Sequence, residues 1–142
     1  MMWNMLWPIG LVVLSNTVYN ICAKSTPESA NAFLSLGMTY IVAAAASLAI
    51  YFVFYYHQSF AIDFKELNWA SFTLGLSVVA LEFAYICIYR AGWRISMASL
   101  TANIALACVL LLVGVFGYKE AISAKQIIGM LVSAAGLILI CK

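Results

Sequence analysis

One acidic residue lies deep within an apolar stretch of this sequence. Glu82 has only apolar neighbours on either side, and Tyr85 and Tyr89 follow at spacings of three and seven. In a helix these three side chains share a face. A carboxylate in lipid costs several kcal/mol unless it is protonated, paired or facing water. The pattern predicts a proton- or substrate-binding carboxylate in a polar cavity, or a structural carboxylate that hydrogen-bonds to a neighbouring helix or reaches toward the membrane surface.

Two further sets of polar residues have the spacing of a helix face. Asn16, Tyr19 and Asn20 form the first set, and Ser96, Ser99 and Asn103 form the second. Such stripes either line a substrate path or hydrogen-bond one helix to another, at about 0.6 to 2 kcal/mol each. We expect Glu82, Tyr85, Asn16, Tyr19, Asn20 and Asn103 to form the substrate-binding set.

Other kinds of chemistry find little support in the sequence. The four cysteines have no paired spacing and lie in apolar surroundings, so we expect buried, unligated thiols and no bound metal. One histidine, His57, limits acid–base catalysis. We find no nucleophile–base pair and no phosphate-binding loop, and expect neither an enzyme nor a cofactor. A net charge of +2 is too small to indicate a nucleic-acid partner.

The elements that position these residues follow from composition. Hydrophobic residues make up 66% of the 142 positions and charged residues 8%, with a mean hydropathy of +1.05. Soluble domains carry roughly 25% charged residues, because their surface faces water. The chain lacks the charge to cover such a surface, so membrane lipid is its expected solvent.

The charged residues divide the sequence into five apolar runs. They cover roughly residues 5–23, 31–56, 69–89, 95–116 and 124–141. Each is long enough to cross the hydrocarbon core, which needs about 20 residues. We therefore predict an all-α fold, an integral membrane bundle of five transmembrane helices that forms one domain over residues 1–142.

Local signals refine the ends of these helices. Asn68 is placed to cap the third run, and Ser123 with Gln126 has the spacing of a capping box before the fifth. Gly117 suits the C-terminal cap of the fourth run. Between the second and third runs, residues 57–68 contain charged and aromatic residues that predict a short interfacial turn.

The loop charges leave the orientation of the bundle open. With five spans, Lys65, Lys119 and Lys125 lie on one side, and four basic residues lie on the other: Lys24, Arg90, Arg94 and Lys142. Three against four is nearly a tie, so the positive-inside rule does not select one orientation. Insertion in both directions would permit an antiparallel homodimer, comparable to an inverted repeat. The alternative is a single orientation set by one dominant loop charge.

The fifth run carries a ridge of small residues. Gly129, Ser133 and Gly136 recur at helical spacing. Small residues let transmembrane helices pack closely. The ridge is therefore a candidate dimer contact, or a packing surface within one chain.

The C-terminal part of the sequence resembles the drug/metabolite transporter superfamily. Three segments resemble the end of an EamA-type repeat. They are Gly117-Tyr118-Lys119-Glu120-Ala121-Ile122-Ser123, then Gln126-Ile127-Ile128-Gly129-Met130, and then Ala135-Gly136. The tail is also similar to the last helix of small multidrug resistance proteins. The resemblance covers about the last fifty residues, and the rest only by helix layout. It implies a half-size transporter, since EamA-type carriers have two five-helix repeats in one chain.

The sequence departs from that resemblance at one position. Small multidrug resistance proteins carry a membrane-embedded glutamate eight residues before a lysine in their first helix, and Asn16 stands at that distance from Lys24. This puts a proton-coupled cation exporter in doubt and makes a neutral or zwitterionic metabolite as credible.

From these features we expect a dimeric, multi-pass secondary transporter of a small metabolite or drug-like solute in the cytoplasmic (inner) membrane. It would work by alternating access around a cavity lined by the first, third and fourth runs. The alternatives are a non-transporting membrane subunit that scaffolds or regulates a partner, and a flippase for lipid-linked substrates.

Overall fold

The computed structural model describes residues 3–55, 59–119, 121 and 123–141. In this part of the chain the elements are six helices: α1 (Trp3–Ser25), α2 (Ala32–Phe54), α3 (Phe60–Lys65), α4 (Trp69–Arg90), α5 (Ile95–Tyr118) and α6 (Ala124–Cys141). No strand occurs among them, so the all-α prediction is confirmed for the described residues. Tyr56, His57, Glu120, Ile122 and Lys142, on which sequence-based predictions rest, lie outside them.

Four of these helices are long and apolar enough to cross a membrane. They are α1 from Leu6 onward, α2, α4 and α5. The chain is therefore a multi-pass membrane protein. Helix α6 covers the fifth predicted run, but it is not among the four, so a fifth crossing stays a prediction.

The helix ends lie close to the predicted ones, with one cap displaced. Asn68 caps α4 by accepting from the Ala70 amide at 2.9 Å. The capping box forms as predicted, because Ser123 N donates to Gln126 Oε1 at 2.8 Å and Gln126 N to Ser123 Oγ at 3.3 Å. The prediction for Gly117 was wrong. Helix α5 continues to Tyr118, and the cap is Lys119 in the left-handed region at φ 55°.

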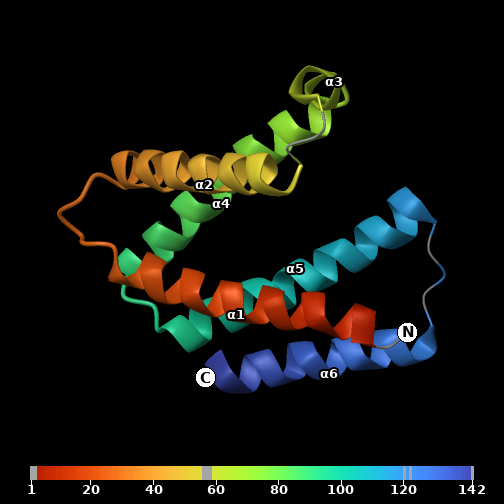
Figure 1. The fold of residues 1–142 in the computed structure, drawn as a ribbon. Coiled ribbons are helices and arrows are strands. Elements are labelled where there is room, and N and C mark those ends of the chain that lie inside the picture. The colour runs from red at the N-terminus through yellow and green to blue at the C-terminus, as the bar shows by residue number, and fades with distance from the viewer. Residues whose placement is uncertain (1–2, 56–58, 120, 122, 142) are drawn as a thin grey trace. The chain divides into compact units, whose positions relative to one another are not determined.

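The chain divides into two compact units, Met1–Ala91 and Gly92–Lys142. In the first unit α1 and α2 each pack on α4, which crosses α2 and meets the C-terminal half of α1 (Figure 1). The core of this unit is a small cluster of Ala32, Leu36 and Ile86, with Tyr40 and Phe83 packed against it. Because so few side chains are buried, the core cannot stabilise the unit in water, and the exposed apolar faces require lipid or protein around them.

The link between α2 and α4 contains the short helix α3. Tyr51 Oη donates to Asp63 Oδ2 at 2.6 Å, and the Tyr51 ring meets the Phe60 ring edge-on at 5.9 Å. The predicted short turn is thus a six-residue helix, and this hydrogen bond ties it to the end of α2.

The second unit is a hairpin of α5 and α6 (Figure 1). Gly129 and Gly136 of the predicted ridge lie on α6, where an added Cβ would meet no described atom within 4 Å. Ser133 Oγ donates to the Gly129 carbonyl at 2.9 Å. Nothing in the described unit packs against the two glycines, so the ridge is open to a neighbour.

Hydroxyl groups on the apolar helices mostly bond to their own backbone. Thr17, Thr39, Ser47 and Ser77 each donate to the carbonyl four residues earlier, at 2.8 to 3.1 Å. In lipid this bond satisfies a polar side chain without a second helix. Hydroxyls of this kind therefore contribute little to holding one helix against another.

Candidate functional site

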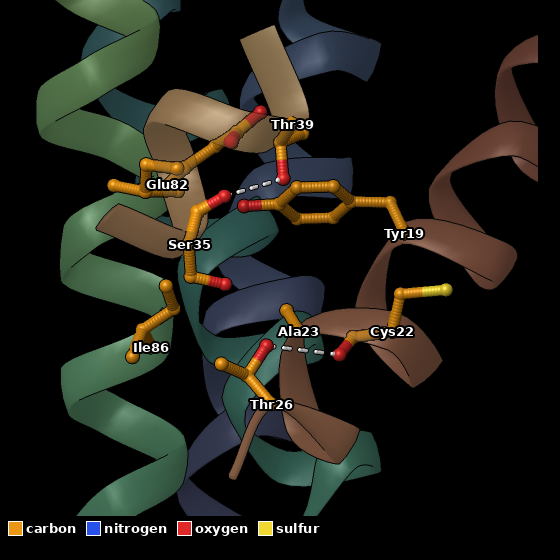
Figure 2. Close-up of a pocket in the computed structure, with 9 residues that line it drawn as sticks. Tyr19, Cys22, Ala23, Thr26, Ser35, Thr39, Glu82 and Ile86 are labelled. Atoms are coloured by element: carbon orange, nitrogen blue, oxygen red, sulfur yellow. Dashed lines mark hydrogen bonds between the residues drawn. The ribbon is translucent and has the colours of Figure 1, made fainter. Parts of the chain in front are cut away.

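A mostly apolar cleft that contains one carboxylate opens between α1, α2 and α4 in the first unit (Figure 2). Its volume is about 100 Å³, and it is lined by Tyr19, Cys22, Ala23 and Thr26 of the α1 end, Ser35, Leu36 and Thr39 of α2, and Glu82 and Ile86 of α4. Helices α1 and α2 both pack on α4. The cleft exists because α1 and α2 leave a space between them, with α4 as its floor.

Glu82 supplies the charge in this cleft. Its side chain is half-buried, and it interacts electrostatically with the hydroxyls of Tyr19 and Tyr40. The Tyr40 hydroxyl of α2 is the neighbouring group close enough to donate to the carboxylate. The nine residues lining the cleft include no lysine or arginine. Within the described chain, the acid therefore meets hydroxyl groups in the cleft and no cation.

The wall opposite Glu82 is built from α1 and α2. Tyr19 extends from α1 toward Ser35 and Thr39 on α2 (Figure 2). The Thr39 hydroxyl donates to the Ser35 carbonyl at 3.1 Å, which leaves its oxygen lone pairs available to a ligand.

Aromatic contacts hold Tyr19 in place from α4. The rings of Tyr19 and Tyr85 meet edge-on at 5.6 Å, and Tyr85 lies 6.0 Å from Tyr89. Between α2 and α4, Phe33 stacks on Phe83 with ring centroids 4.6 Å apart. These pairs fix α1 and α2 relative to α4 and so set the width of the cleft.

The asparagines of α1 form a separate group, whose hydrogen bonds are made to each other and to Tyr89 of α4. Asn20 Nδ2 donates to the Asn16 carbonyl at 2.7 Å and to Asn16 Oδ1 at 2.8 Å. Its Oδ1 accepts from the Tyr89 hydroxyl, and both Asn20 and Tyr89 are only 4% exposed. Asn20 is thus a buried contact between α1 and α4, and its amide faces protein partners instead of the cleft.

Two basic residues organise the ends of α1 and α4. Lys24 Nζ donates to the Tyr89 carbonyl at 3.3 Å, and Arg90 Nη2 donates to the carbonyls of Pro27 and Ala30 at 3.1 and 2.6 Å. They border a second, more polar pocket of about 140 Å³ beside the cleft. Cations near helix C-termini complement the helix dipole, and Arg90 also ties the α1–α2 link to α4.

Five of the six predicted substrate-binding residues come together in the first unit. Glu82 and Tyr19 line the cleft, Tyr85 supports Tyr19, and Asn16 and Asn20 form the adjoining contact. Asn103 lies on α5 in the second unit, where its amide donates to Ser99 Oγ at 3.2 Å.

The contribution of α2 was missed. The predicted cavity was lined by the first, third and fourth runs, whereas Ser35, Leu36 and Thr39 of α2 line the cleft. Ser35 and Thr39 are spaced four apart in the first third of a largely apolar helix. That spacing was an available signal.

The cysteines differ from expectation. Cys22 and Cys87 are exposed, and the Cys22 residue lines the cleft. Expecting buried cysteines assumed a densely packed bundle, and the described helices bury few residues. No group of three or more His, Cys, Asp or Glu side chains able to hold a metal occurs among the described residues. Comparison with protein-family models, with curated proteins and with solved structures gives no match to this chain.

Proposed function

We propose that this chain is a half-size secondary transporter that moves a small metabolite or drug-like solute across the cytoplasmic membrane. It would act as a dimer by alternating access. The observation that carries the proposal is the position of Glu82, a carboxylate inside a membrane-crossing helix and on the wall of a cleft between three helices. An ionisable residue at such a position is a functional candidate by default.

The rest of the cleft supports the same interpretation. Hydroxyl groups from α1, the α1–α2 link and α2 lie in its otherwise apolar wall, and none of its lining residues is a cation that would neutralise Glu82 permanently. Its partner on the neighbouring helix is the neutral Tyr40 hydroxyl, so within the described residues the charge of Glu82 is left for a ligand or a proton to neutralise.

The size of the cleft supports a dimer. Sites for drug-sized ligands have volumes of about 300 to 1,000 Å³, and this cleft has about 100 Å³. A solute cavity therefore needs walls beyond those of the first unit. We propose that a second copy, in the same or the opposite orientation, supplies them, with Gly129, Ser133 and Gly136 of α6 as the dimer contact and α6 as a fifth span.

The experiment is a solute-uptake measurement in proteoliposomes. Vesicles with and without the protein are incubated with a defined mixture of small metabolites, and their contents are quantified by mass spectrometry. We expect at least one solute to accumulate or exchange only in the protein-containing vesicles. Glu82→Gln, which keeps the shape of the side chain and removes its charge, should lower that flux by about tenfold or more.

The matched control is Glu66→Gln. Glu66 is an exposed acid at the end of α3, outside the membrane-crossing helices. Its replacement should leave flux within about twofold of wild type. Full flux in Glu82→Gln would refute the role of the cleft, and no flux for any solute in a well-folded protein would refute transport.

The alternative is a non-transporting subunit, and the open ridge on α6 is the observation in its favour. An exposed small-residue face fits a different chain as well as a second copy. Crosslinking of a Ser133→Cys variant in native membranes distinguishes the homodimeric transporter from the subunit of another protein. A homodimeric product supports the transporter, whereas a single fixed heterologous partner supports the subunit.

A further inference from the structure

A second pocket lies beside the cleft, where the C-terminal ends of α1 and α4 meet (Figure 1). Lys24 and Arg90 stand in the last turns of these two membrane-crossing helices, so the pocket is at the level of the lipid headgroups. It shares three lining residues with the cleft, and the two spaces therefore adjoin. Its volume is about 140 Å³, and its lining residues are Ala23, Lys24, Thr26, Glu28, Ile86, Tyr89 and Arg90.

The charged residues of this pocket leave it positive. Lys24 and Arg90 each contribute a positive charge, and Glu28, an exposed residue of the α1–α2 link, contributes a negative one. The lining residues therefore carry one net positive charge. A phosphodiester carries one negative charge, so a single group of this kind would neutralise the pocket.

The Arg90 guanidinium has an unused donor. Arg90 Nη2 donates to the carbonyls of Pro27 and Ala30, which occupies both hydrogens of that nitrogen and fixes the guanidinium on the α1–α2 link. Arg90 Nε is buried and has no hydrogen-bond partner among the described residues. Buried donors are nearly always paired. An unpaired guanidinium N–H on a residue that lines a positive pocket indicates an acceptor from outside the described chain, and phosphate is an acceptor that arginine recognises well.

The Lys24 ammonium is positioned by Tyr89. Lys24 Nζ donates to the Tyr89 carbonyl at 3.3 Å and lies 5.8 Å from the centre of the Tyr89 ring. Tyr89 is itself buried, and its hydroxyl donates to Asn20 of α1. The charge of Lys24 is therefore held at the pocket by a side chain that has little freedom to move.

The volume and the location of the pocket favour a lipid headgroup over a larger soluble ligand. One water takes about 30 Å³ in the liquid, so about 140 Å³ accommodates a group of about five non-hydrogen atoms, such as a phosphate. Directly before Lys24 on α1, Val18 and Ile21 are exposed and apolar. In a membrane such residues contact acyl chains, which would continue from a headgroup held at the end of the helix.

We propose that this pocket binds the phosphate group of an anionic phospholipid, with phosphatidylglycerol as the probe, between Lys24 and Arg90. Basic pockets between transmembrane helices are known to bind anionic headgroups. The site is distinct from the cleft, and the proposal does not depend on transport. The bound headgroup joins the ends of α1 and α4 to the α1–α2 link. Because Thr26 of this link lines both spaces, lipid occupancy also stabilises the wall of the cleft.

The test is a titration of phosphatidylglycerol into the purified full-length protein in a neutral detergent, with bound lipid counted by native mass spectrometry. Phosphatidylcholine with the same acyl chains is the comparison, because its headgroup has a phosphate but no net charge. We expect saturable binding of phosphatidylglycerol, about tenfold tighter than that of phosphatidylcholine. Arg90→Gln should weaken it by about tenfold and Lys24→Gln by about fivefold. Lys65→Gln is the control, since Lys65 is an exposed base on α3 and should change binding by less than about twofold.

The variant Glu28→Gln tests the charge balance in the opposite direction. Removing this carboxylate makes the pocket more positive, so we expect phosphatidylglycerol to bind about two- to fivefold tighter. A variant that merely disturbed the fold would not bind more tightly, so Glu28→Gln and Lys24→Gln keep the test valid even if Arg90→Gln does not fold.

Two outcomes overturn the proposal. Equal affinity for the two lipids, or affinity for phosphatidylglycerol that is the same in wild type, Lys24→Gln and Glu28→Gln, shows that the pocket does not bind an anionic headgroup. Displacement of the lipid by millimolar inorganic phosphate, in wild type but not in Lys24→Gln, assigns the pocket to a soluble phosphate and removes the lipid as its ligand.

Discussion

The hydrogen bond between Tyr89 and Asn20 provides a direct test of how α1 is held on α4. The Tyr89 hydroxyl donates to Asn20 Oδ1, and both residues are 4% exposed. Tyr89→Phe keeps the ring and removes only this bond. Hydrogen bonds between transmembrane helices contribute on average about 0.6 kcal/mol and at most about 1.7. Because the pair is fully buried, we expect about 1 to 1.7 kcal/mol, a five- to eighteenfold change in the unfolding equilibrium.

The measurement is a double-mutant cycle with Tyr89→Phe, Asn20→Ala and the double variant. Unfolding is followed by circular dichroism as SDS is titrated into mixed micelles. The coupling free energy isolates the pair, because losses of packing that occur in only one variant cancel. Tyr118→Phe is the control, since Tyr118 is 77% exposed at the end of α5 and should change stability by less than about 0.5 kcal/mol. A coupling energy below about 0.3 kcal/mol would refute this account of the contact.

Three further predictions concern helix ends. Arg90→Lys keeps the charge but should not reach both carbonyls of the α1–α2 link, so we expect a loss of about 1 to 2 kcal/mol and faster proteolysis of residues 26–31; unchanged proteolysis would contradict this. Ser123→Ala removes the capping box of α6 and should cost about 0.5 to 2 kcal/mol in the same SDS titration, whereas Ser123→Thr should cost little. Lys119→Gly relieves a left-handed residue at φ 55° and should raise the unfolding temperature, corresponding to about 1 kcal/mol, and a fall would show that Lys119 makes a compensating contact.

Much of the helix layout could be read from the sequence, because lipid imposes its constraints locally. Each membrane-crossing helix must bury about 20 apolar residues and satisfy its own backbone. Charges and caps therefore mark the ends, and Asn68 and Ser123 were placed correctly for that reason. The end of α5 was misjudged because a glycine is the usual left-handed residue, while Lys119 takes that conformation here.

The candidate site was predictable in part. Glu82 and Tyr19 stood out because ionisable and polar residues are expensive in lipid and therefore informative. Ser35 and Thr39 did not stand out, because hydroxyls are common on transmembrane helices and bond to their own backbone. Whether such a hydroxyl also faces a cleft depends on the neighbouring helix.

The sequence alone determined that this is a helical membrane protein with a carboxylate inside one of its helices. Those properties depend on composition and on spacing along one helix. Only the tertiary structure decided that α2 lines the cleft, that Asn20 pairs with Tyr89, and that Tyr19 of α1 and Glu82 of α4 share one cleft. Contacts between helices depend on which faces meet and at what angle. Many faces of a helix surrounded by lipid are almost equally apolar, so the pattern of one helix does not reveal its partner.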